Sequence, residues 1–118
     1  MMNLILKLSE DFETIKMYDI SIMMDGVKIG YAELFIAFDE DGDEDAAYIK
    51  SIEIKKDFRN RGYGTATLKQ LAEEHNGIYI CPDNKDAERL YARLGEETNA
   101  PEAFESELDN WDTMYFIR

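Results

Sequence analysis

The stretch Arg59-Asn60-Arg61-Gly62-Tyr63-Gly64-Thr65 decides the fold of this chain. It follows a strand-like run, Tyr48–Ile54, and precedes a segment, 68–75, in which apolar residues recur at helical spacing. A strand, a turn that contains glycine and a helix start, in that order, direct several backbone N–H groups and a helix N-terminus toward one anion. Glycines let the backbone approach that anion closely because they carry no side chain. The stretch therefore predicts a phosphate-binding turn.

Upstream of this turn, the sequence predicts three antiparallel strands. Asn3–Leu8 is typical of a first strand. From Thr14 to Met24 apolar residues occupy alternate positions, and Asp25-Gly26 is a pair favoured in two-residue hairpin turns. The partner strand, Val27–Phe38, changes the face on which its apolar residues fall. That change predicts either a β-bulge or a strand buried on both faces.

The acidic segment Asp39–Asp45 interrupts the strands and invites comparison with a calcium-binding loop. An EF-hand loop needs glycine at position six and glutamate at position twelve, whereas counting from Asp39 gives Glu44 and Lys50. We therefore expect a solvated hairpin loop, followed by a fourth strand over Ala46–Ile54.

Downstream of the turn, the pattern alternates between helix and strand. The first helix is expected to end at Asn76-Gly77, a pair suited to the left-handed backbone conformation. Ile78–Cys81 is typical of a short buried strand, and a second amphipathic helix ends at Gly95. A short helix after Pro101 and a last strand over Trp111–Ile117 complete the chain. Four strands, a helix, a strand, a helix and a strand predict an α+β fold with a mixed, mostly antiparallel sheet.

Composition indicates a folded, acidic protein. The chain has 118 residues, 45% of them hydrophobic and 12% aromatic, which predicts a single globular domain over residues 1–118. Its formal net charge of −13 disfavours binding to nucleic acid or to anionic lipid, and favours solubility or a cationic partner. Cys81 is the one cysteine, and we find neither a secretory leader nor a long apolar run. We therefore expect a cytoplasmic protein that is not bound to a membrane.

The motif Arg59-x-x-Gly62-x-Gly64 resembles the acyl-coenzyme A motif of the GNAT superfamily of N-acetyltransferases. In that family a strand leads through the motif into a helix, and a second strand, an asparagine and a helix with Leu-Tyr-x-x-x-Gly follow. Here the corresponding pieces are Ile52–Ile54, Ile78–Cys81, Asn84 and Leu90-Tyr91-Ala92-Arg93-Leu94-Gly95. The resemblance covers residues 46–95. The glycine patterns of a Rossmann fold or a P-loop are absent from the sequence.

The resemblance implies that acetyl-CoA binds as cosubstrate in a split between two strands. Backbone N–H groups of the turn would hold its pyrophosphate, the strand edge at Ile52 and Ile54 would pair with the pantetheine amides, and the Asn84 side chain would reach the same arm. The residues expected to bind the cosubstrate are Ile52, Ile54, Arg59, Arg61, Gly62, Tyr63, Gly64, Thr65 and Asn84. No metal is expected.

The implied reaction is direct attack of an amine on the thioester, which needs a base, a group that polarises the carbonyl and an acid for the leaving sulfur. Tyr91 matches the general-acid tyrosine of the family, although Tyr91 could also be an ordinary core residue. Glu53 and Glu33 are the candidates for the general base, with a water relay as the alternative. We expect Cys81 and His75 to be structural, because neither has a nucleophile–base partner in the pattern.

The chain departs from the family between its first two strands, where most relatives insert two helices that form one wall of the acceptor site. Only Ser9–Glu13 separates the two strand-like runs here. The acceptor side is therefore expected to be open, which suits a peptide or protein amine, or to be completed in a homodimer, which suits a small cationic amine such as a polyamine. Two alternatives differ in kind: a catalytically weak acyl-CoA-binding or regulatory domain, and an acidic decoy for the basic surface of another protein.

Overall fold

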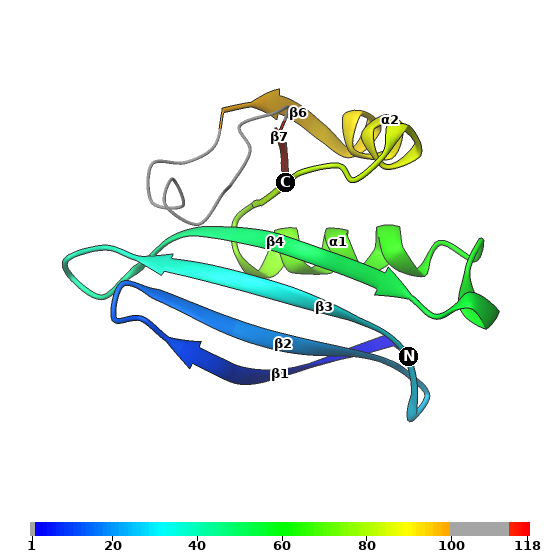
Figure 1. The fold of residues 1–118 in the computed structure, drawn as a ribbon, viewed down its shortest axis with the longest axis horizontal. Coiled ribbons are helices and arrows are strands. Elements are labelled where there is room, and N and C mark those ends of the chain that lie inside the picture. Colours follow the sequence, from blue (N-terminus) through cyan, green and yellow to red (C-terminus); the bar gives the residue numbers. More distant parts are fainter. Residues whose placement is uncertain (1, 100–113) are drawn as a thin grey trace.

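The computed structural model describes residues 2–99 and 114–118. The elements in chain order are β1 (Met2–Asp11), β2 (Ile15–Met24), β3 (Val27–Phe38), β4 (Glu44–Ile54), the 3-10 helix η1 (Lys56–Phe58), α1 (Tyr63–Glu74), β5 (Ile78–Ile80), α2 (Lys85–Leu94), β6 (Gly95–Thr98) and β7 (Met114–Ile117). The strands form one sheet in the order β1-β2-β3-β4-β5-β7-β6 (Figure 1). Only the β4–β5 pair is parallel among these neighbours. The predicted fold class is confirmed.

The turn between β2 and β3 has the predicted two-residue form, because Asp25 (φ 50) and Gly26 (φ 83) both take positive φ. β3 contains a bulge and is also buried on both faces, so both explanations for the change in its apolar pattern apply. The register against β2 shifts between Ile22 and Met23, as a bulge requires. Further along β3, the neighbours Leu34 and Phe35 are both buried, on opposite faces.

β1 is longer than the sequence indicates. The strand was expected to end at Leu8, before the polar residues Ser9, Glu10 and Asp11. It runs to Asp11 instead, because Glu10 and Asp11 still pair with β2 after a register shift. β1 is an edge strand, so polar residues on it remain in water at little cost. Residues 12–14 alone join β1 to β2, and a hydrogen bond from the Phe12 N–H to the Ile15 carbonyl (2.8 Å) closes the hairpin. No helix lies between the first two strands.

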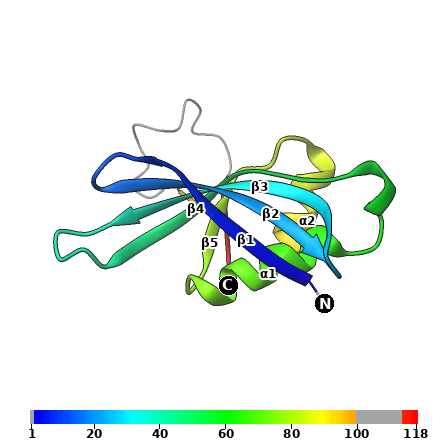
Figure 2. The ribbon, with the colours of Figure 1, turned by 90° about the horizontal axis from the view of Figure 1, so that it is seen from below.

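Helix α1 covers one face of the sheet (Figure 2). Its buried side is Thr67, Leu68, Leu71 and Ala72. Leu68, Leu71 and Ala72 pack in one cluster with the inward side chains of β2, β3 and β4, and each fully buried Leu or Ile contributes about 1.5–3 kcal/mol to folding. A second, smaller cluster lies on the opposite face of the sheet and contains Ile15, Phe35, Ala37, Tyr48 and Met114.

The end of α1 follows the prediction. Asn76 (φ 56) and Gly77 (φ 109) are left-handed, and the Gly77 N–H donates to the Ala72 carbonyl over 2.7 Å. The ring of Phe116 occupies the space where a Cβ at residue 77 would lie. Glycine is thus required here by both its backbone and its packing.

Two elements were not predicted. β6 begins directly at Gly95, where α2 ends, and pairs with β7 although its sequence, Gly-Glu-Glu-Thr, is polar. An edge strand needs only one pairing side, so its side chains need not be apolar. The short helix η1 was also missed. The helix expected after Pro101 and the start of the strand expected from Trp111 lie outside the described residues.

The acidic loop is a hairpin turn, as expected. The Asp39 carboxylate accepts hydrogen bonds from the N–H groups of Asp41 (2.9 Å) and Asp43 (3.0 Å). Across residues 2–99 and 114–118, no cluster of three or more side chains is arranged to hold a metal ion. In the same part of the chain, no helix is long and apolar enough to cross a membrane.

Candidate active site

The sheet splits between its two parallel strands. β4 and β5 pair only at Tyr48↔Tyr79 and Ile49↔Ile80, and β5 then ends, whereas β4 continues to Ile54. The last part of β4 therefore has β3 on one side and no strand on the other among the described residues. The structure places Ile52 and Ile54 on this unpaired length, whose free backbone groups can bind an extended ligand.

A β-bulge marks the point of divergence. Glu33 pairs with Ser51 and Leu34 with Ile49, so Lys50 is the extra residue in β4. Its ammonium lies 5.7 Å from the centre of the Phe35 ring. Bulges bend a strand and increase its twist, which accounts for the separation of β4 from β5 beyond Ile49.

The turn after β4 ends in an exposed helix N-terminus. Gly62 caps α1 with a left-handed backbone (φ 79), and no atom lies within 4 Å of the position of a Cβ there. The first helical hydrogen bond runs from the Ala66 N–H to the Gly62 carbonyl (3.0 Å), so the N–H groups of residues 62–65 precede it. No side chain caps them, and the first turn carries no acidic residue. Open N–H groups at a helix start favour an anion.

Cations are concentrated beside this helix start. Lys55, Lys56, Arg59 and Arg61 fall within seven residues of a chain with only 13 Lys and Arg against 26 Asp and Glu. The guanidinium of Arg61 stacks over the Phe58 ring at 6.0 Å. Lys55 and Lys56 were missed by the motif comparison. Their local excess of positive charge is visible in the sequence and could have identified them.

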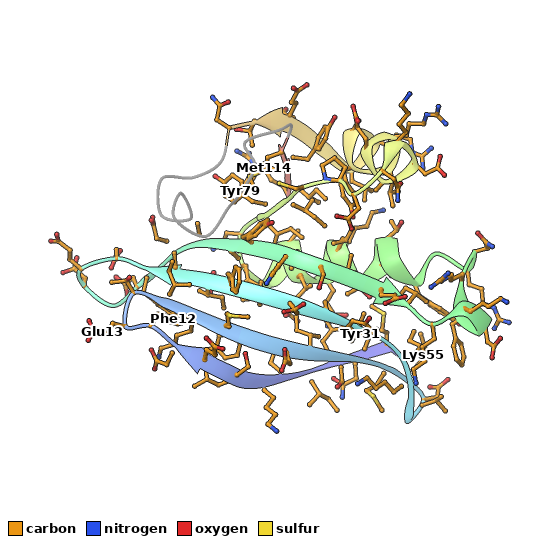
Figure 3. All side chains as sticks on the ribbon, in the orientation of Figure 1. Phe12, Glu13, Tyr31, Lys55, Tyr79 and Met114 are labelled. Atoms are coloured by element: carbon orange, nitrogen blue, oxygen red, sulfur yellow. The ribbon has the colours of Figure 1, made fainter. Side chains whose placement is uncertain are left out.

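Arg59 is held by the end of β4. Its Nε donates to the Ile54 carbonyl (2.8 Å), and its Nη2 donates to the Glu53 Oε1 (3.2 Å). The second oxygen of Glu53 accepts a hydrogen bond from the Tyr31 hydroxyl, and this bond raises the pKa of Tyr31. Figure 3 shows Tyr31 and Lys55 at the same end of the sheet. The structure therefore brings Arg59, Glu53 and Ile54 together, with Tyr31 as an unpredicted fourth member.

Glu33, the other base candidate, lies apart from this group. It sits opposite Asp19 on β2 and opposite Ser51 on β4, and the Ser51 hydroxyl donates to its carboxylate over 2.9 Å. Along β4, Ser51 is the residue next to the bulge, whereas Glu53 lies two residues nearer to the turn. Glu33 is thus the carboxylate beside the point where β4 and β5 part.

Tyr91 is on α2 and is 7% exposed. Burial raises the pKa of its hydroxyl to about 12, and the nearby Asp83 and Cys81 add to the shift. Its ring meets that of Tyr115 edge-on, with centres 6.5 Å apart. Asp83 and Cys81 lie in the segment between β5 and α2, so the charge that acts on Tyr91 comes from the chain just beyond the split.

A second tyrosine, Tyr48, lies near Cys81 and was not identified from the sequence. Burial first, and then Cys81 and Asp83, raise its pKa. Tyr48 is in β4, in the first of the two pairs that β4 makes with β5. Strand register alone brings it to Cys81, and no local sequence signal indicates this.

Asn84 has a structural role that the motif comparison did not include. It is the N-cap of α2, and its side-chain oxygen accepts a hydrogen bond from the Ala87 N–H over 2.8 Å. Its amide nitrogen is the group left to donate to a ligand. His75 likewise has a local partner, because its Nδ1 lies 2.9 Å from the Glu44 carboxylate.

A cavity of about 500 Å³ lies away from the predicted site. It is lined by Arg93, Leu94, Gly95, Glu96, Phe116 and Arg118, between α2, β6 and β7. None of the predicted site residues lines it. The predicted cosubstrate-binding residues between Ile52 and Thr65 lie instead along the unpaired end of β4 and at the start of α1.

A sheet split between parallel strands, with an anion-binding helix start at its mouth, defines a fold that can hold a phosphate-bearing ligand along β4. The family model of the acetyltransferase (GNAT) family matches residues 6–95, and the chain belongs to that family. The resemblance found in the sequence is therefore confirmed. No curated protein sequence matches the chain significantly.

Solved structures agree on the fold. The KacTA–DNA complex is similar over 90% of this chain and 69% of its own, with a TM-score of 0.57 and 19% identity. A mutant of the toxin AtaT bound to the C-terminus of the antitoxin AtaR matches over 87% of this chain, with a TM-score of 0.56 and 13% identity. This chain spans 65% of that AtaT chain. A GNAT family acetyltransferase from Elizabethkingia anophelis with acetyl-CoA bound matches over 89% of this chain and 76% of its own, with a TM-score of 0.53 and 17% identity.

Proposed function

We propose that this protein transfers an acetyl group from acetyl-CoA to a primary amine of a cationic acceptor. The observation that carries the proposal is the split between β4 and β5 with the open N–H groups of residues 62–65 at its mouth. A ligand with a pyrophosphate at one end and amides along an arm suits this arrangement. Membership of an acetyltransferase family and the acetyl-CoA in a similar structure support the choice of ligand.

The geometry sets the direction of the donor. With the pyrophosphate at the start of α1, the pantetheine arm runs back along β4 from Ile54 toward the bulge at Lys50. Four residues of extended strand span about 13 Å, which is a suitable length for part of that arm. The thioester then lies near the point of divergence, where β5 ends and the chain continues through Cys81 to α2, the helix that carries Tyr91.

This direction separates the two base candidates. Glu33 lies across from Ser51, beside the bulge, so we propose Glu33 as the group that takes the proton from the attacking amine, directly or through water. Glu53 lies nearer to the pyrophosphate end and is engaged by Arg59 and Tyr31. We therefore propose that Glu53 positions Arg59 near the donor and does not act as the base.

The remaining roles follow from position. The amine attacks the thioester carbon, the carbonyl oxygen becomes an oxyanion, and the carbon–sulfur bond then breaks. Unpaired N–H groups on β4 polarise the carbonyl, and Tyr91 protonates the departing thiolate. The raised pKa of Tyr91 keeps its proton in place at neutral pH, as a general acid requires.

The acceptor reaches the site over the sheet face that carries Asp19, Glu33 and Glu53. Register aligns Asp19 with Glu33, and the link of residues 12–14 leaves no helix over them. Negative charge on an open face favours a cationic acceptor, such as a polyamine or a lysine-containing peptide.

The test combines binding and turnover. Acetyl-CoA should raise the melting temperature, and thiol should be released when spermidine or a lysine peptide is added; an N-acetylated peptide serves as control. Stabilisation without thiol release for any amine would indicate an acyl-CoA-binding domain. Neither stabilisation nor release would overturn the proposal, and salt-sensitive capture of a basic protein without the donor would then favour the acidic decoy.

A further inference from the structure

Arg59 contacts two groups at the end of β4 that face the proposed donor site. Its Nε donates a hydrogen bond to the Ile54 carbonyl on the unpaired length of β4, and its Nη2 forms an ion pair with the Glu53 carboxylate. Ile54 is where β4 meets the turn that leads to Gly62. In the free protein, one guanidinium therefore closes the strand edge and holds a carboxylate beside the expected position of the pyrophosphate.

We propose that Arg59 is a switch residue that exchanges Glu53 and the Ile54 carbonyl for a phosphate of the acyl donor. The exchange releases the Ile54 carbonyl to accept an amide N–H of the donor, and it releases Glu53 to attract a cationic acceptor. This inference rests on the proposed function and adds one feature to it: Glu53 and a phosphate of the donor compete for Arg59.

The exchange is energetically accessible. The Arg59 and Glu53 side chains are 51% and 52% exposed, and ion pairs of that exposure contribute little to stability. A guanidinium can make two parallel N–H bonds to a phosphate, and the whole pyrophosphate carries two negative charges against one on the Glu53 carboxylate. Glu53 remains held after the exchange, because Tyr31 still donates to its other oxygen.

The other cations of the turn do not make the same exchange. Arg61 is stacked on Phe58, and no ion pair to a described acidic side chain is found for it or for Lys55 and Lys56. Arg59 is the member of the group that couples the turn to β4. Glu53 and the phosphate therefore compete for this one side chain.

The experiment measures the affinity for coenzyme A by titration calorimetry in a double-mutant cycle. Glu53→Gln removes the competing charge and should tighten binding about two- to fivefold, since the lost pair is exposed. Glu40→Gln, at the far end of the β3–β4 hairpin, removes the same charge and is the control. In an Arg59→Ala background the gain from Glu53→Gln should disappear.

The outcomes are separable. Equal affinities of the Glu53→Gln and Glu40→Gln variants would overturn the exchange, as would a gain that persists without Arg59, because simple repulsion would explain that gain. Thermal melting of each variant checks folding, and both side chains are exposed. If the unaltered protein does not bind coenzyme A, the proposed function fails as well, whereas normal binding with an inert Glu53→Gln variant refutes the switch alone.

Discussion

The proposed donor side and the proposed acceptor face of this protein are built in different ways. The donor side consists of the end of β4, the turn to α1, and the segment from Cys81 through α2, and most of its contacts join residues close in sequence, such as Arg59 with Ile54 and Asn84 with Ala87. The acceptor face is the sheet surface around Asp19, Glu33 and Glu53, which strand register brings together. The residues proposed to bind the acyl donor are therefore close together in the sequence. Those proposed to receive the acceptor come from different strands and meet only when the sheet forms.

The largest effect is expected on the donor side, from Gly62→Asp. It places a carboxylate among the open N–H groups of residues 62–65, and repulsion of the pyrophosphate should weaken coenzyme A binding by at least about 100-fold. Gly42→Asp is the matched control, because Gly42 (φ 82) has the same backbone conformation and equally open space in the acidic loop. Calorimetry measures both variants. Unchanged affinity after Gly62→Asp would show that the N–H groups of residues 62–65 do not bind the pyrophosphate.

Tyr91→Phe tests where the two sides meet. Loss of the acid should slow turnover about 100-fold with nearly unchanged affinity for coenzyme A. Because the Tyr91 pKa is raised to about 12, the hydroxyl stays protonated well above neutral pH, so the loss should be the same at pH 7 and at about pH 9. Tyr115→Phe, its edge-on neighbour, is the control. An undiminished rate would leave Tyr91 as a core residue.

Glu33→Gln tests the acceptor face. Removal of the base should lower the rate about 10- to 100-fold without changing donor affinity, which sets it apart from a donor-side change. Asp19→Asn, directly opposite on β2, should only raise the KM for a cationic amine a few-fold, as expected for charge attraction alone. Equal effects of the two variants in steady-state kinetics would show that Glu33 acts only through its charge.

The smallest effect separates the two roles of Asn84. Asn84→Ala removes the N-cap of α2 and should lower the free energy of unfolding by about 1 kcal/mol, whereas Asn84→Ser keeps a capping oxygen and should change it by only a few tenths. Urea denaturation measures both. If Asn84→Ser keeps its stability but loses affinity for coenzyme A, the side chain also contacts the donor. Full affinity in that variant would limit Asn84 to capping.

The same contrast explains what could be predicted. The turn at residues 59–65 combines glycine and helix signals in a short window, so its place between β4 and α1 followed directly from the sequence. The approach of Tyr31 to Glu53 depends on the bulge at Lys50, and that of Tyr48 to Cys81 depends on the register of β4 against β5. An alternating pattern reveals neither. The polar strand β6 was missed for a related reason, because its pairing with β7 supplies what its composition does not.

The hairpin of residues 12–14 has a consequence for engineering. It joins β1 to β2 at an exposed position, with Phe12 51% exposed, and it contributes no contact to the turn or to α2 among the described hydrogen bonds. Foreign segments inserted there lengthen a surface loop, which costs little free energy. The chain thus offers a small scaffold into which segments of different shape can be inserted at residues 12–14 while the proposed donor side keeps its sequence.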